Sequence, residues 1–170
     1  MHVRFAEPRD ADEIERIRVR GWQAAYRHVF PPEKLDAIPL DSSRWRDRLL
    51  SPEPGFEVLL ATEADQVVAF ASLYAYEDEP KTALVGAFYV DPPHWQRGIG
   101  GDLLRQAEDR LSERYSAAVL WVLEANHRAR QFYERAGWSA DGATESNERL
   151  GVTALELRYR KRLSSSRSRG

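Results

Sequence analysis

Apolar runs in the middle of the chain and at both of its ends predict β-strands. Three runs are separated only by short acidic turns, which favours antiparallel neighbours. These runs cover 56–62, 67–76 and 83–90. A fourth run, 117–123, is apolar at almost every position, as expected of a strand covered on both faces. Alternation predicts a last strand over 153–159, and residues 1–5 form a short first strand.

Apolar positions spaced three and four apart predict helices between these strands. The first helix, around 10–26, carries two apolar stripes, so we expect it to be covered on two sides. The stripes are Ile14, Ile17, Gly21 and Ala25 on one side and Val19, Trp22 and Tyr26 on the other. Further helices are expected over 33–37, 42–50, 101–115 and 126–136. Asn126 is a good N-cap for the last of these, and Gly137 suits its C-terminal end.

This order of elements predicts an α/β (α+β) fold. We expect a mixed, mostly antiparallel sheet of six to seven strands flanked by about four helices. No internal repeat or linker divides the chain, so one domain is expected over 1–163, followed by a disordered tail over 164–170. The last strand, 153–159, is expected at an exposed edge, where a second copy of the chain could pair with it.

Composition narrows the classes of function. The 170 residues carry a net charge of −2, which argues against a nucleic-acid binder held by bulk electrostatics. The chain has no cysteine, which excludes disulfides and thiol catalysis and fits a reducing cytoplasm. No apolar run approaches the roughly 18 residues of a membrane span, so no membrane partner is expected. The histidines show no metal-ligand spacing, so we expect no metal site.

A glycine-rich loop between the strand 83–90 and the next helix is the first candidate for chemistry. Gly98, Gly100 and Gly101 lie within four residues, so an anion could approach the main chain at the positive end of a helix. Gln96 and Arg97 add donors. A tight structural turn would use the same glycines. A Walker A loop needs Gly-Lys-Ser/Thr, which is absent, and the third glycine of a Rossmann turn is missing.

Together with a second motif, this loop resembles the GNAT superfamily of N-acetyltransferases. Trp95-Gln96-Arg97-Gly98-Ile99-Gly100 is similar to the family's loop Arg/Gln-x-x-Gly-x-Gly/Ala, with Trp95 where arginine or glutamine is usual. The segment 126–138 is similar to the family's Asn-x-x-Ala-x-x-Phe-Tyr-x-x-x-Gly-Phe helix. The resemblance covers 3–163. It implies an acetyl-CoA-dependent acyltransferase, a sheet with a central splay and, by family habit, a homodimer.

The resemblance also implies how acetyl-CoA would bind. The cosubstrate would lie between two strands that splay apart where they end, at Val90 and Leu123. Its pyrophosphate would rest on the loop amides, its pantetheine arm would pair with the preceding strand, and Asn126 would bond near that arm. The implied cofactor-binding residues are Phe88, Tyr89, Val90, Gln96, Arg97, Gly98, Ile99, Gly100, Gly101, Asn126 and Tyr133.

The chemistry implied by the resemblance is direct attack of a primary amine on the thioester. Tyr133 would lie by the sulfur and protonate the departing thiolate, although a core aromatic would occupy the same helical stripe. The amide of Val90 would stabilise the oxyanion. Three residues are candidates for the general base: Glu124 at the end of a splayed strand, Glu79 in an acidic turn and His94 beside the loop. We favour Glu124 over Glu79.

The acceptor would lie near the end of the first helix. Trp22, Tyr26 and His28 are expected to border its groove, although Trp22 and Tyr26 could equally pack onto the sheet. We favour a small-molecule amine as substrate. The alternatives are acetylation of a protein N-terminus or lysine, and a CoA-binding sensor without turnover. A closed aromatic pocket would favour the small molecule, and a shallow charged groove the peptide.

Overall fold

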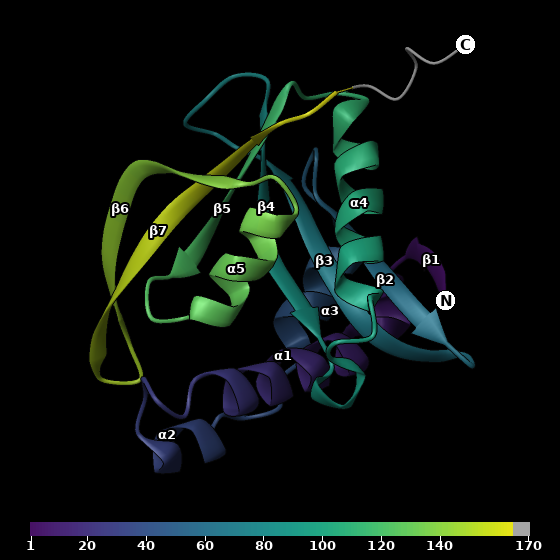
Figure 1. Cartoon of the computed structure of the whole chain (residues 1–170). Helices are drawn as coiled ribbons and strands as arrows, with labels where there is room; N and C mark the ends of the chain where they lie inside the picture. The colour runs from purple at the N-terminus through teal and green to yellow at the C-terminus, as the bar shows by residue number, and fades with distance from the viewer. Residues whose placement is uncertain (165–170) are drawn as a thin grey trace.

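The computed structural model describes residues 1–164, and over these the chain forms one seven-stranded sheet with helices on both faces (Figure 1). The sheet order is β1-β2-β3-β4-β5-β7-β6. The strands are β1 His2–Phe5, β2 Glu57–Glu63, β3 Gln66–Ala75, β4 Thr82–Val90, β5 Ala117–Leu123, β6 Ser139–Arg149 and β7 Val152–Arg162. The helices are η1 Pro8–Asp10, α1 Ala11–Ala25, α2 Pro32–Asp36, α3 Ser43–Leu50, η2 Pro92–His94, α4 Ile99–Ser112 and α5 His127–Arg135.

The predicted mixed, mostly antiparallel sheet is confirmed. Neighbouring strands run antiparallel everywhere except at β4 and β5, which pair in parallel across the crossover helix α4. Within the described chain there are five α-helices, where about four were expected. Of the expected disordered tail, 164–170, all but Ser164 lies outside the described residues.

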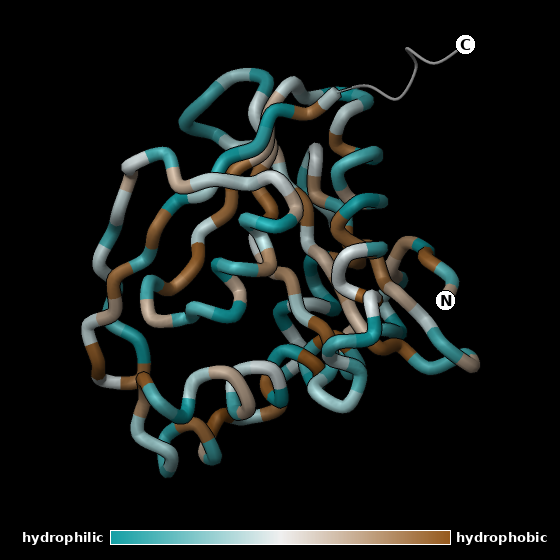
Figure 2. Tube along the Cα trace, viewed as in Figure 1, coloured by the Kyte–Doolittle hydropathy of each residue, from teal (hydrophilic) through white to brown (hydrophobic). Residues whose placement is uncertain are grey.

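One expectation about the sheet is wrong. The segment 153–159 is not an exposed edge, because β7 lies between β5 and β6 and pairs with both. The edge is β6, whose side chains are mostly exposed. The sequence of β6 is polar and has no apolar alternation, so hydrophobic periodicity did not predict it. Figure 2 shows this strand largely in hydrophilic colours, whereas hydrophobic positions gather along the central strands.

Each face of the sheet has its own apolar core (Figure 1). On one face α4 and α5 pack on the central strands through Leu103, Leu104 and Tyr133. On the other face α1 packs through Ile14 and Ile17. A third cluster joins the end of α1 and α2 to β5 and β7. Its buried members are Tyr26, Phe30, Leu35, Leu123 and Ala154. This cluster holds the aromatic end of α1 beside the end of β5.

The predicted central splay is present between β4 and β5. The parallel ladder joins Thr82–Val85 to Ala117–Leu120 and stops there. The last five residues of β4 therefore have β3 on one side and no strand on the other. This break in an otherwise continuous sheet makes room for a ligand between two strands.

A β-bulge at Gly86 decides which main-chain groups face that gap. Ser72 pairs with Ala87, but the next pair is Leu73 with Val85, so Gly86 is an extra residue in β4. An extra residue reverses which side of a strand the following N–H and C=O groups face. Glycine is needed at this point, because a Cβ on Gly86 would lie 2.5 Å from Cε2 of the Tyr74 ring, which β3 carries beside it.

Beyond the bulge, two residues of β4 present their main chain to the gap. The Asp91 N–H donates to the Val68 carbonyl at 2.8 Å, so Asp91 is a hydrogen-bonded position of the β3–β4 ladder. Antiparallel residues alternate between bonded and non-bonded positions, so Phe88 and Val90 point their N–H and C=O groups away from β3. Without the bulge, their neighbours would face the gap instead.

Trp138 closes the α5 side of the core and gives a direct test of this packing. It is 2% exposed, its ring lies 6.2 Å from that of Tyr133, and its indole N–H donates to Glu108 at 2.8 Å. We expect Trp138→Ala to lower the free energy of unfolding in urea by about 3–5 kcal/mol. The matched control, Leu40→Ala at a 68% exposed position, should change it by less than about 0.5 kcal/mol. A cost below about 1 kcal/mol for Trp138→Ala would contradict the packing.

Candidate functional site

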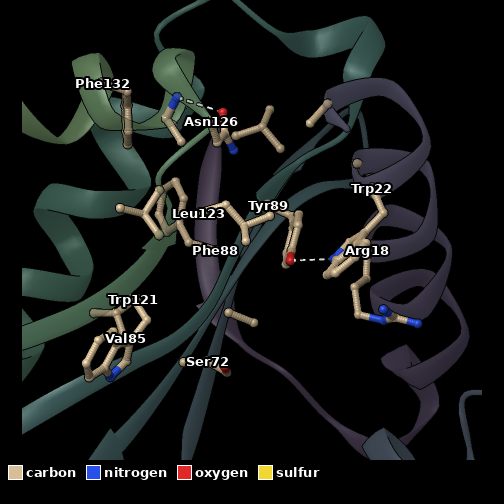
Figure 3. A pocket seen from close by; sticks show the side chains of 18 of the residues that line it. Arg18, Trp22, Ser72, Val85, Phe88, Tyr89, Trp121, Leu123, Asn126 and Phe132 are labelled. Carbon is tan, nitrogen blue, oxygen red and sulfur yellow. Dashed lines mark hydrogen bonds between the residues drawn. The ribbon is translucent and has the colours of Figure 1, made fainter. Parts of the chain in front are cut away.

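A cleft of about 1050 Å³ passes through the sheet where β4 and β5 diverge. Residues from both faces line it: Ala129 and Phe132 of α5 on one side, and Trp22 and Tyr26 of α1 on the other. Figure 3 shows Phe132 on one side of the cleft, Trp22 on the opposite side and the end of β4 between them. The cleft therefore joins two chambers that meet at the splay.

The glycine loop forms one wall of the cleft. Gly98 has φ +83° and stands directly before α4, and Gln96 also has a positive φ of +62°. A Cβ on Gly98 or Gly101 would meet no atom within 4 Å, and one on Gly100 would lie 3.4 Å from Phe132. The first N–H groups of α4 have no acceptor inside the helix. The loop therefore offers main-chain donors and open space for an anion.

Most of the sequence-predicted loop residues line the cleft, but Arg97 does not. The lining members are Gln96, Gly98, Ile99, Gly100 and Gly101. The guanidinium of Arg97 instead pairs with Glu63 at 3.2 Å.

Trp95, the departure from the family's loop pattern, fixes the loop to the end of β4. Its indole N–H donates to the Val90 carbonyl at 2.7 Å. The guanidinium of Arg128 lies 3.5 Å from the centre of its ring. Arg128 lines the cleft, makes no ion pair with any residue of 1–164, and has its pKa lowered by burial. Sequence reasoning missed Arg128, because only the fold shows that the first turn of α5 faces the loop.

The start of the loop is tied to α1. The buried Asp91 carboxylate pairs with Arg16 and with Arg20, each at 3.2 Å. His94 lines the cleft, and its buried Nδ1 has no hydrogen-bond partner in the described part of the chain. The two ion pairs of Asp91 therefore hold the strand-to-helix turn against α1.

Three tyrosines meet at the splay. Tyr26 accepts a hydrogen bond from Asn126 Nδ2 at 3.2 Å, and Tyr89 accepts one from Trp22 Nε1 at 2.8 Å. Tyr133 is 7% exposed and lines the cleft, and among residues 1–164 its hydroxyl has no partner. Burial, followed by the neighbouring Tyr26 and Tyr89, raises the pKa of Tyr133 well above its usual value. At neutral pH this phenol is therefore protonated and able to donate.

Asn126 has two structural contacts. Its Oδ1 accepts the Ala129 N–H at 3.1 Å, which confirms the predicted N-cap of α5, and its Nδ2 binds Tyr26. The side chain also lines the cleft. Gly137, at φ +87°, follows the C-terminal end of α5 as predicted.

The residues favoured as general base do not line the cleft. Glu124 is exposed at the end of β5. Glu79 lies in the β3–β4 turn, at the opposite end of β4 from the splay, where Arg160 binds its carboxylate at 2.6 and 2.9 Å and lowers its pKa. His28, expected beside the acceptor, is exposed and bonds the Ala125 carbonyl at 3.0 Å.

Other carboxylates line the cleft instead. They are Glu15, Asp41, Glu145 and Glu156, of which Glu15 and Glu156 are buried. Glu15 receives two hydrogen bonds from Arg18 and one from Trp45. The alternation of β7 predicted that Glu156 points away from Leu155 and Leu157, but no pattern in the sequence indicated that this face borders the cleft. Among the described residues no group of histidines and carboxylates could hold a metal ion.

Aromatic side chains line the α1 side of the cleft, referred to below as the acceptor chamber. Trp22 and Tyr26 both line it, and they also pack together, with ring centres 4.9 Å apart and Phe30 stacked on Trp22 at 5.6 Å. The two side chains therefore border the cleft and also pack within the aromatic cluster; their role toward an acceptor stays a prediction. Ser72, fully buried beside the bulge, lines the chamber with a hydroxyl that finds no partner in 1–164. No helix of the described chain is long and apolar enough to cross a membrane.

Solved structures share this fold. The PaiA N-acetyltransferase of Thermoplasma acidophilum, in complex with coenzyme A, superposes with a TM-score of 0.75 over 95% of this chain and 99% of that one, at 16% identity. A ribosomal-protein-alanine N-acetyltransferase of Brucella melitensis gives a TM-score of 0.75 over 96% of this chain and 100% of that one, at 21% identity. At these identities the likeness is one of fold.

Sequence comparison identifies the family. A protein of Mycobacterium tuberculosis named a probable N-acetyltransferase is 27% identical over 165 residues, 94% of this chain and 92% of that protein. An uncharacterized N-acetyltransferase of Archaeoglobus fulgidus is 25% identical over 138 residues, 78% of this chain and 89% of that protein. The profile of the acetyltransferase (GNAT) family matches residues 13–138. With its splayed sheet and glycine loop, the chain belongs to the acetyltransferase (GNAT) family.

Proposed function

We propose that the protein transfers the acetyl group of acetyl-CoA to a primary amine, and that the amine is a small molecule. The observation that carries this proposal is the cleft through the sheet, which has an anion-binding loop on one side and an aromatic chamber on the other. The coenzyme A held by the Thermoplasma protein, which shares the fold, supports the choice of cosubstrate.

The loop and the end of β4 bind different parts of acetyl-CoA. The pyrophosphate rests on the main-chain donors at Gly98–Gly101, and Arg128 adds a nearby positive charge. The pantetheine arm runs along β4 and bonds the main chain of Phe88 like an added strand. The Val90 carbonyl already accepts from Trp95, so its N–H is left to stabilise the oxyanion.

The reaction needs a neutral amine and a proton for the leaving thiolate. Neutralising a lysine-like amine at pH 7 costs roughly 4.6 kcal/mol, given a pKa of about 10.4. The neutral amine attacks the thioester carbonyl, the tetrahedral intermediate loses its extra N–H proton to water, and its collapse breaks the C–S bond. Tyr133, which its raised pKa keeps protonated at neutral pH, donates its phenolic proton to the departing sulfur and regains a proton from water.

The shape of the acceptor chamber favours a small molecule over a peptide. Trp22, Tyr26 and Tyr89 enclose it with rings. The buried carboxylates of Glu15 and Glu156, paired with Arg18 and with the exposed Arg149, line the cleft with polar groups. Fixed aromatic walls with a few polar groups are typical of small-ligand sites.

The first experiment is a calorimetric titration with acetyl-CoA, followed by a thiol-release assay on a panel of amines. We expect micromolar binding and turnover of a compact amine. The panel includes polyamines, amino sugars, amino-acid derivatives and an alanine-terminated peptide. Turnover of the peptide alone would replace the small-molecule proposal, and binding without any turnover would favour a sensor.

A substitution at Gly101 tests whether the glycine loop binds acetyl-CoA or serves only as a structural turn. The exposed position of Gly101 in the first turn of α4 has room for a Cβ, and alanine is a better helix former than glycine by about 1 kcal/mol. We therefore expect Gly101→Ala to raise the melting temperature slightly. Because the added methyl group stands among the pyrophosphate donors, acetyl-CoA binding should weaken roughly tenfold, or about 1.4 kcal/mol. Calorimetry and thermal melts measure both, and unchanged affinity would mean that the loop is only structural.

Tyr133→Phe tests the proton donor. Removing the hydroxyl leaves the packing of the ring intact, so the Kd of acetyl-CoA should stay within about twofold while kcat falls roughly 100-fold. Tyr115→Phe, which removes a hydroxyl outside the cleft, is the matched control and should retain full turnover. A Tyr133→Phe variant with normal kcat would exclude this tyrosine as the acid.

A further inference from the structure

Glu156 is a buried carboxylate at the point where β4 leaves β5. In the β5–β7 ladder it stands opposite Leu123, the last residue of β5. It is 7% exposed, and its side chain shares a strand face with Ala154, which packs against Tyr26. Glu156 also lines the cleft. The carboxylate therefore reaches the site from the α1 side of the sheet.

The edge strand β6 holds this carboxylate in one position. Asn147 Nδ2 donates to Oε2 at 2.9 Å. Arg149 approaches Oε1 through Nε at 3.2 Å and Nη2 at 3.0 Å. A carboxylate accepts about four hydrogen bonds, two on each oxygen. Oε1 is thus filled by Arg149, and Oε2 has one acceptor position left.

The surroundings of Glu156 place it across the splay from Tyr133. Both side chains line the same cleft. Tyr133 comes from α5 on one face of the sheet, and Glu156 faces α1 on the other. A thioester in the gap between β4 and β5 lies between them.

The other cleft carboxylates are less suited to meet the acceptor nitrogen. Glu15 lies on the α3 side of α1, where Trp45 and Arg18 bind it. Asp41 and Glu145 are exposed. Burial matters here, because a charge-assisted hydrogen bond strengthens as water is removed.

We propose that Glu156 binds the ammonium group of the acceptor through Oε2 and positions its nitrogen beside the thioester. The ammonium group then releases one proton to water, and the neutral amine attacks the thioester carbonyl with the freed lone pair. Arg149 and Asn147 are positioning residues that fix the carboxylate. The acceptor is accordingly a primary alkylamine that enters the cleft as a cation. This inference rests on the proposed function, because it requires acetyl-CoA in the splay.

Two S-alkylated CoA derivatives test the inference without knowledge of the acceptor. S-(2-aminoethyl)-CoA carries an ammonium group beside the sulfur, near the position of an attacking amine. S-propyl-CoA is the neutral compound of the same size. Calorimetry should show that the wild-type protein binds the ammonium derivative roughly 10-fold more tightly than the propyl derivative.

Glu156→Gln should reduce this affinity ratio to about one while leaving the affinity for S-propyl-CoA within twofold. Glu148→Gln, which removes an exposed charge of β6 outside the cleft, should keep the wild-type ratio. Arg149→Gln should lower the ratio while leaving the affinity for S-propyl-CoA within twofold, because it removes donors that fix Oε1 and keep the buried carboxylate ionised. A purely structural role for Glu156 gives no reason for a change in the ratio. This variant also keeps the test decisive if Glu156→Gln fails to fold.

The outcomes separate this inference from the proposed function. Equal binding of the two derivatives by the wild-type protein, or a ratio that stays at its wild-type value in Glu156→Gln or in Arg149→Gln, would overturn the role of Glu156 alone. Failure of the wild-type protein to bind either derivative or acetyl-CoA would overturn the proposed function and this inference with it.

Discussion

The site depends on the place where the parallel pairing of β4 and β5 ends. The ladder stops at Val85 and Leu120, and the bulge at Gly86 follows at once. The first feature leaves one side of β4 without a partner, and the second turns the main chain of Phe88 and Val90 toward that side. Unpaired main-chain groups inside a protein are costly unless a ligand or water binds them. The same break therefore weakens the sheet and provides a strand-like ligand with its binding edge.

The rest of the molecule compensates for this break. Trp95 caps the free carbonyl of Val90, and Asp91 ties the following turn to α1. Across the gap, Asn126 caps α5 and binds Tyr26 of α1, so one amide joins elements from opposite faces of the sheet. These polar contacts act where strand pairing cannot, and they hold the walls of the cleft apart at a fixed distance.

Local signals in the sequence predicted most of the fold, and long-range geometry accounts for what they missed. The glycines at 98–101 and the cap at Asn126 act within one turn of chain, so their spacing alone was informative. The polar strand β6 is defined by pairing with β7, and nothing in its own periodicity reveals it. Glu79 and Glu124 looked suitable because they adjoin the right strands, but the direction of β4 and the exposed end of β5 place them outside the cleft.

In the proposed reaction, the two faces of the sheet take different parts for a physical reason. An acid that must keep its proton until the last step needs a low dielectric and no charged partner, which is the environment of Tyr133 against the α5 core. A carboxylate that binds a cation must stay ionised while buried, which requires donors such as those of Asn147 and Arg149. One uniform pocket cannot satisfy both demands. A cleft that passes through a sheet can satisfy both demands, because each face supplies its own surroundings. The hydroxyl of Tyr133 and the carboxylate of Glu156 would then approach the same thioester from opposite faces.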